Sequence, residues 1–402
     1  MITALTAHTG LGRLILTSRR VPAGVTGLRV EAVDALSASE GLLLARELPN
    51  LRRLIRRELP GIEPETARQL ARGVLAITQG HPKLLELADG QAADPERLTN
   101  LVESGDQAWR EQGGLPDGLF ATGETTADPG DYLHVLAAWT RAVTDTLTPG
   151  ERDLFWFLCC LEEPDRELSV LEANWGGVWS RLGRDGRPAD LHHALAIVTA
   201  RGLTAHGEGT RSCTVHPGVA ATGLVHAGKP FQDAVDTEAA AFWMQVALHQ
   251  ASGGEADTGL MVRAGLAAVP YLIRQQRPKE AADFLEHAFL LDPSRANAAA
   301  ILPAIQQLTD HDPAHAGVLG RVLQAIDPAA AETQLRAALD ATASSGDYRG
   351  ASAIAGRLSN LCRGAGRLGE ALEFAERANE YTRQGERQRL TLAVHIERRL
   401  FR

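Results

Sequence analysis

The chain has 402 residues, of which 44% are hydrophobic and 23% are charged, and its formal net charge is −9. At roughly 150 residues per domain this length predicts two to four domains. The acidic balance excludes a general electrostatic attraction to nucleic acid or anionic lipid. No uncharged apolar run reaches the roughly 18 residues that span a membrane, and four cysteines are too few for a disulfide framework, so we expect a cytoplasmic protein.

Residues 1–60 have the pattern of a small piece of an α/β domain. The short apolar run RLILTS (13–18) predicts a buried strand, and LRVEAV (28–33) predicts a second. Gly10 and Gly12 precede the first of these strands. A phosphate-binding loop needs its glycines after a strand and before a helix, so these two glycines indicate a turn instead.

The next part of the chain is predicted to be helical. Ser37, with Glu40 three residues later, predicts a capping box at a helix start. Residues 61–146 carry apolar residues at helical spacing, and Pro82 suits the first position of a helix. Residues 113–131 are rich in Gly, Thr, Asp and Pro, which predicts a long loop.

Residues 147–230 combine three helical stretches with a hairpin pattern. A first helix is expected to begin at Thr148 or the proline after it, and further helices at 169–182 and 189–201. Two short strand-like pieces then surround a Gly-rich turn within 202–217. Three helices followed by a hairpin are typical of a winged-helix domain.

Residues 231–402 are predicted to form helical hairpins that repeat along the chain. The Gly-Asp pair at Gly346 recurs as Gly-Glu at Gly385, 39 positions later. Ala371 and Ala378 lie seven residues apart, on one face of the helix between these points. A single hairpin cannot bury its apolar face, so we expect such units to stack.

Several motifs together resemble a known family. From about Gly12 to Ala220 the chain resembles the back half of a STAND-class NTPase, the NB-ARC-like signalling ATPases. LILTSRR is similar to the last core strand with its sensor arginine, GHPKLLELA to the GxP motif of the small helical domain, and VHPGVA to the histidine motif that ends the winged helix. From about Gly259 onward the chain resembles tetratricopeptide (TPR) repeats.

The resemblance implies a nucleotide site made of three residues. Arg19 would sense the γ-phosphate or a neighbouring subunit, and Pro82 would pack against the adenine. His216 would contact the β-phosphate of bound ADP and hold a closed resting state. ADP or ATP is therefore the cofactor that the family implies.

The sequence also departs from the family. No GxxxxGK[ST] motif occurs, and only thirteen residues precede Leu14, where the phosphate loop and the acidic metal-binding strand belong. We therefore do not expect this chain alone to hydrolyse ATP, and we assign no catalytic residue and no metal site. A fragment of a longer ATPase, a misassigned gene start and a degenerate relative all fit this departure.

The predicted fold is mainly α. It comprises a small α/β remnant (1–60), a helical domain (61–146), a winged-helix domain (147–230) and an α-solenoid of TPR-like hairpins (231–402). The predicted function is a regulatory, signal-transducing module: an ADP/ATP-dependent switch whose TPR surface docks a protein or peptide, with self-association as a further possibility.

Two other functions stay open. One is a TPR interaction scaffold without nucleotide binding, which the missing phosphate loop favours. The other is a DNA-binding transcriptional regulator, which the acidic balance disfavours. The predicted winged helix offers only three arginines near its second helix, Arg181, Arg184 and Arg187.

Overall fold

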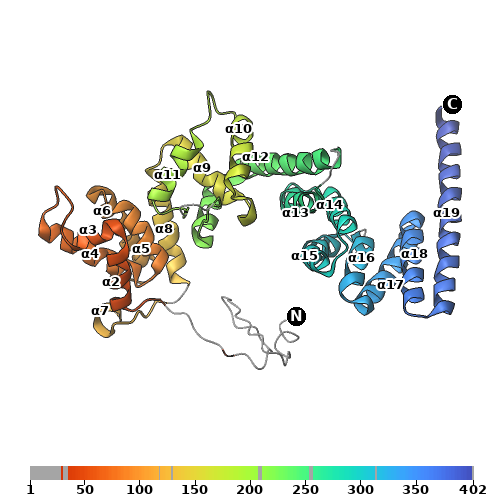
Figure 1. Cartoon of the computed structure of the whole chain (residues 1–402), viewed down its shortest axis with the longest axis horizontal. Helices are drawn as coiled ribbons and strands as arrows, with labels where there is room; N and C mark the ends of the chain where they lie inside the picture. Colours follow the sequence, from red (N-terminus) through yellow and green to blue (C-terminus); the bar gives the residue numbers. More distant parts are fainter. Residues whose placement is uncertain are drawn as a thin grey trace. The chain divides into compact units, whose positions relative to one another are not determined.

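The computed structural model describes residues 29, 35–116, 118–127, 130–206, 211–252, 257–312 and 315–400. These residues form helices and two isolated antiparallel bridges, which confirms the prediction of a mainly α protein (Figure 1). Both predicted strands near the N-terminus fall outside the described residues, Arg29 excepted. The chain divides into two compact units, 1–143 and 144–402.

The first unit is a cluster of helices around α4, α5 and α6, which pack on one another. Apolar residues of α5 and α6 are fully buried there, among them Leu84, Leu98 and Trp109. The helices of this unit are α2 (Ala38–Glu47), α3 (Pro49–Ile55), α4 (Pro64–Thr78), α5 (Pro82–Gln91), α6 (Pro95–Glu111), α7 (Gly118–Thr122) and α8 (Asp131–Asp145), the last of which extends past the unit boundary.

Local side-chain signals set several helix starts in this unit. Glu40 N donates to Ser37 Oγ at 3.3 Å and Ser37 N donates to Glu40 Oε2 at 2.9 Å, so the predicted capping box is confirmed. Pro82 is the first residue of α5, as predicted. Gly80, just before it, has a φ of +78°, and a Cβ there would lie 1.9 Å from the carbonyl oxygen of Leu36. Only glycine fits that position.

The second unit begins with four helices. These are α9 (Pro149–Cys160), α10 (Leu168–Arg181), α11 (Leu191–Ala200) and α12 (Pro217–Ser252), with a short 3₁₀ helix, Glu163–Asp165, after α9. Helix α9 packs on α11 and α12, and α10 packs on α12. Thr148 and Glu151 form the capping box of α9. Ala205 and Thr214 exchange two backbone hydrogen bonds of 2.8 and 2.9 Å, in the segment where the hairpin is predicted.

The rest of the second unit is a row of helices in which each packs on the next (Figure 1). The row comprises α13 (Thr258–Arg274), α14 (Pro278–Leu291), α15 (Arg295–His311), α16 (Ala316–Ile326), α17 (Pro328–Ser345), α18 (Tyr348–Gly364) and α19 (Leu368–Leu400). Ala281 and Ala371 are buried between neighbouring helices, and Ala378 packs partly buried on the same core. These small residues let the helix axes approach closely.

Among the described helices, none combines the length and the apolar character that crossing a bilayer requires.

Candidate functional site

The three residues that the family resemblance implies occupy separate parts of the chain. Arg19 lies outside the described residues. Pro82 is exposed at the start of α5 in the first unit, and His216 precedes α12 in the second. Gly218 N donates to His216 Nδ1 at 3.2 Å, so the imidazole caps the first turn of α12. A common nucleotide site for these residues stays a prediction.

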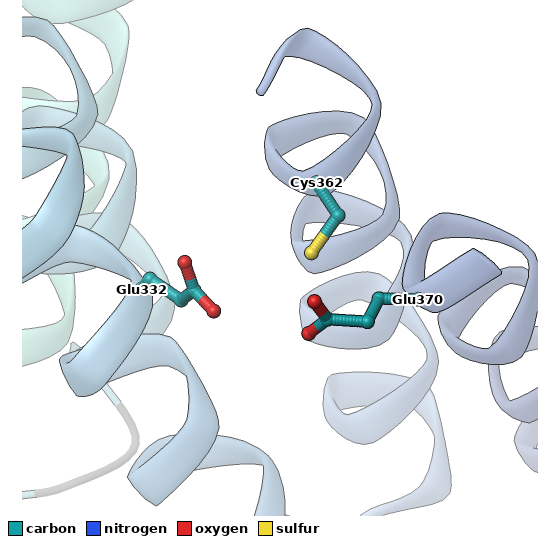
Figure 2. A group of neighbouring side chains, drawn as sticks. All are labelled: Glu332, Cys362 and Glu370. Atoms are coloured by element: carbon teal, nitrogen blue, oxygen red, sulfur yellow. The ribbon is translucent and has the colours of Figure 1, made fainter. Parts of the chain in front are cut away.

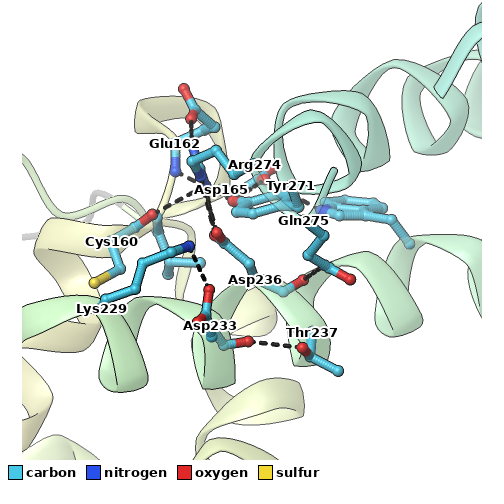
Figure 3. Close-up of polar contacts among 12 residues, drawn as sticks. Cys160, Glu162, Asp165, Lys229, Asp233, Asp236, Thr237, Tyr271, Arg274 and Gln275 are labelled. Atoms are coloured by element: carbon cyan, nitrogen blue, oxygen red, sulfur yellow. Dashed lines mark hydrogen bonds and ion pairs between the residues drawn. The ribbon is translucent and has the colours of Figure 1, made fainter. Parts of the chain in front are cut away.

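A cluster of charged side chains, of which Asp236 is buried and Arg274 and Glu162 are partly exposed, joins the end of α9 to α12 and α13 (Figure 3). Arg274, the last residue of α13, donates from Nη2 to Asp236 Oδ1 at 2.8 Å and to the Cys160 carbonyl at 3.3 Å, and its Nη1 bonds Glu162. Burial opposes the charge of Arg274, but the hydrogen bonds from its guanidinium to Asp236 and Glu162 outweigh that effect and raise its pKa. Three segments far apart in the sequence therefore meet at one guanidinium.

A second buried carboxylate belongs to the same cluster, which we call the joint. Asp165 is 2% exposed, and its Oδ2 accepts from Tyr271 Oη at 2.6 Å and from Trp243 Nε1 at 3.2 Å. Tyr271 Oη also accepts from Glu162 N at 3.1 Å. Burial raises the pKa of Asp165, although its two hydrogen bonds oppose this. The joint, defined by Glu162, Asp165, Asp236, Tyr271 and Arg274, fixes α13 on the preceding helices.

Two arginines share one glutamate on the row of hairpins. Helices α14, α16 and α18 contact one another in turn and carry Glu286, Arg321 and Arg357. Arg321 Nη1 lies 3.0 Å and Arg357 Nη2 lies 3.5 Å from Glu286 Oε1. Burial lowers the pKa of Arg357, and the positive charge of the neighbouring Arg321 lowers it further. We call Arg321 and Arg357 the arginine pair. With Glu286 they form a group that carries more positive than negative charge. The side chain of Arg321 is 27% exposed and that of Arg357 is 22% exposed.

Glu332, Cys362 and Glu370 have potential metal-binding atoms within 4.8 Å of one another (Figure 2). Both carboxylates are occupied by arginines, however: Arg336 Nη2 lies 2.7 Å from Glu332 Oε1 and 2.6 Å from Glu370 Oε2, and Arg367 bonds both acids. Burial raises the pKa of the Cys362 thiol, which disfavours the thiolate that a metal needs. We interpret the group as an ion-pair network joining α17 to α19.

None of these clusters was singled out from the sequence. Two pairs in the last cluster leave a local signal: Glu332 and Arg336 lie four residues apart, and Arg367 and Glu370 lie three residues apart. Asp165 and Tyr271 lie 106 residues apart, and Arg357 and Glu286 lie 71 residues apart, so helical periodicity gives no indication that they meet.

Comparisons of the chain with protein-family models, with curated proteins and with solved structures found no match.

Proposed function

We propose that this chain is a regulatory partner-binding module. The row of hairpins from α13 to α19 docks an acidic segment of a protein, and the part from α9 to α12, which we infer to be a winged-helix domain, receives the effect through the joint. The observation that carries the proposal is the arginine pair, in which Arg321 and Arg357 share the single carboxylate of Glu286.

The chemistry of the arginine pair favours a carboxylate-bearing partner. A guanidinium presents a planar fork of donors that matches a carboxylate. Arg357 is desolvated and lies beside a like charge, so a second carboxylate would relieve an existing imbalance. Glu286 already holds both arginines in place, which limits the conformational entropy that a partner must remove.

Binding of a labelled oligoglutamate peptide to the full chain, followed by fluorescence anisotropy, tests the proposal. We expect saturable binding that weakens as salt is added, and no binding of an oligoserine peptide. Arg321→Gln and Arg357→Gln should each weaken binding by about tenfold, because each removes a charge-assisted contact.

Arg363→Gln is the matched control, since Arg363 is exposed on the same helix as Arg357 but outside the pair. Circular dichroism melts of all variants separate lost binding from lost folding. Equal affinity of wild type and Arg321→Gln, or an equal loss in Arg363→Gln, would overturn the assignment of the arginine pair.

A nucleotide-dependent switch is the second candidate function. Pro82 is exposed at the first position of α5, so its ring and the positive end of that helix are accessible to a ligand. Titration of the chain with ADP by calorimetry tests this function. Absence of heat at millimolar ADP would remove the switch and leave the partner-binding module intact.

DNA binding by the α9–α11 region is disfavoured by the pairing of two of the three arginines near its second helix. Arg184 donates two hydrogen bonds, of 2.9 and 3.0 Å, to the buried carboxylate of Asp153. Arg181 lies 2.5 Å from Glu238. Phosphate contacts need arginines whose charge is not already neutralised.

A further inference from the structure

A cavity of about 330 Å³ lies in the second unit between the end of α9, the start of α12 and the end of α13. Leu161, Val215 and Leu224 form apolar parts of its wall, and Ala220 lies on the α12 side. This volume is at the lower end of the range for small-molecule pockets, roughly 300–1,000 Å³. The cavity therefore suits a small molecule rather than a peptide.

One positive charge on the cavity wall is buried without a counter-ion. Arg166 is 8% exposed and donates from Nε to the Leu158 carbonyl at 2.9 Å and from Nη2 to the Leu161 carbonyl at 3.0 Å. Within the described part of the chain, its Nη1 has no hydrogen-bond partner, and no carboxylate lies at ion-pair distance. Buried arginines are rare unless they are paired, so the wall offers a site for an anion.

Arg166 caps the C-terminal end of α9, but this role accounts for only part of its hydrogen-bonding capacity. The two carbonyls belong to the C-terminal end of α9, whose partial negative charge favours a cation. They leave one edge of the Arg166 guanidinium without a hydrogen-bond acceptor and compensate only about half of its charge. The first turn of α12, which begins at Pro217 on the same wall, adds the positive end of a helix dipole.

The acidic groups of the wall divide into paired and unpaired ones. Glu162 and Asp236 both pair with Arg274, so these three groups together carry one excess negative charge. Glu163 is exposed and, among the residues that the structure describes, has no ion-pair partner. Among the described residues the cavity wall therefore presents one cation without a carboxylate partner, Arg166, and an excess of negative charge at Glu163 and around Arg274.

We propose that this cavity binds a small zwitterion, a free α-amino acid with an apolar side chain. Its carboxylate bonds the free edge of Arg166, its ammonium group faces Glu163, and its side chain packs on Leu161, Val215 and Leu224. A phosphate dianion fits less well, because only one free guanidinium edge is available to bind it and Glu163 would repel it. The site is separate from the arginine pair on the hairpins.

The test uses the full chain and isothermal titration calorimetry with L-valine, L-leucine, L-methionine and L-phenylalanine at millimolar concentration. At least one is expected to bind and to raise the melting temperature. For L-leucine, the analogues isocaproate and isoamylamine, which each lack one charge, should bind about tenfold more weakly or worse.

Three variants connect the binding to the cavity. Ala220→Leu should abolish binding by filling the space, whereas Ala221→Leu, on the exposed side of α12, should leave it unchanged. Glu163→Gln lies on the surface and should keep the fold, yet weaken leucine about tenfold without affecting isocaproate. No binding by any of the four amino acids, retained binding in Ala220→Leu, or equal binding of isocaproate and leucine would each overturn the proposal.

Discussion

The hydroxyl of Tyr271 is the most informative single group to remove from the joint. Tyr271→Phe keeps the buried ring but deletes the 2.6 Å hydrogen bond to Asp165 and the acceptor of Glu162 N. A hydrogen bond to a charged group contributes about 1.5–3 kcal/mol, and an orphaned buried N–H costs about 1 kcal/mol or more. We expect a loss of about 2–4 kcal/mol in the free energy of unfolding of the second unit.

This loss converts into a measurable shift in melting temperature. For domains of roughly 150–250 residues, 1 kcal/mol corresponds to roughly 2–4 °C, so Tyr271→Phe should melt about 4–16 °C lower than wild type. Thermal unfolding followed by tryptophan fluorescence is a suitable assay, because Trp243 also bonds Asp165. Tyr348→Phe, in the same unit and only partly buried, is the control and should change stability by less than about 0.5 kcal/mol.

The pH dependence separates a charge effect from a packing effect. Burial raises the pKa of Asp165 in the folded state, so ionisation of this group costs stability as pH rises through that pKa. Without the Tyr271 hydroxyl this cost grows, and the deficit of Tyr271→Phe should shrink as pH falls from about 7 toward the pKa of Asp165. A deficit matching that of Tyr348→Phe, or one that does not change with pH, would refute the reasoning.

Three further changes have clear expectations. Hydrogen bonds, first of all the one from Arg367, lower the pKa of Glu332 from 4.5 to about 2. Glu332→Gln should therefore lower the urea midpoint of unfolding near neutral pH, and the difference from wild type should disappear as pH falls from 4.5 toward 2. A Cβ on Gly105 would lie 2.4 Å from Trp139 Nε1, so Gly105→Ala should destabilise the first unit by about 1–3 kcal/mol in calorimetry. Burial raises the pKa of the Cys160 thiol to about 12, so mass spectrometry should show alkylation by iodoacetamide only after denaturation; equal rates in native and unfolded chain would contradict this.

The sequence was sufficient where the determining contacts are local. The capping box at Ser37 was predicted because it needs only a hydroxyl and a glutamate three residues later, and the helix start at Thr148 was predicted from residues equally close in the sequence. Helix ends set by tertiary contacts were harder to predict. The loop predicted at 113–131 contains the short helix α7, Gly118–Thr122.

The joint was outside the reach of sequence reasoning for a different reason. Asp165 lies within the polar stretch EEPDRE, where composition predicts exposure, yet it is buried by α12 and α13. Its partners come from more than seventy residues away, and helical periodicity identifies only which face of a helix is buried. The same limit applies to Arg166, whose burial depends on a cavity formed by three separate segments.

The contacts of Arg274 in the joint restrict how α13 can move relative to α9 and α12. Removing the partner of a buried charge is strongly destabilising, and Asp236, which is 1% exposed, is such a charge. Arg274 satisfies Asp236 and Glu162 together only when α13 is seated in one orientation on α12 and on the end of α9. Because α13 also packs on α14, which carries Glu286, a partner that moves α14 must either carry the joint with it or separate these charges. The second course is costly, so we infer that α9 to α14 move as one body.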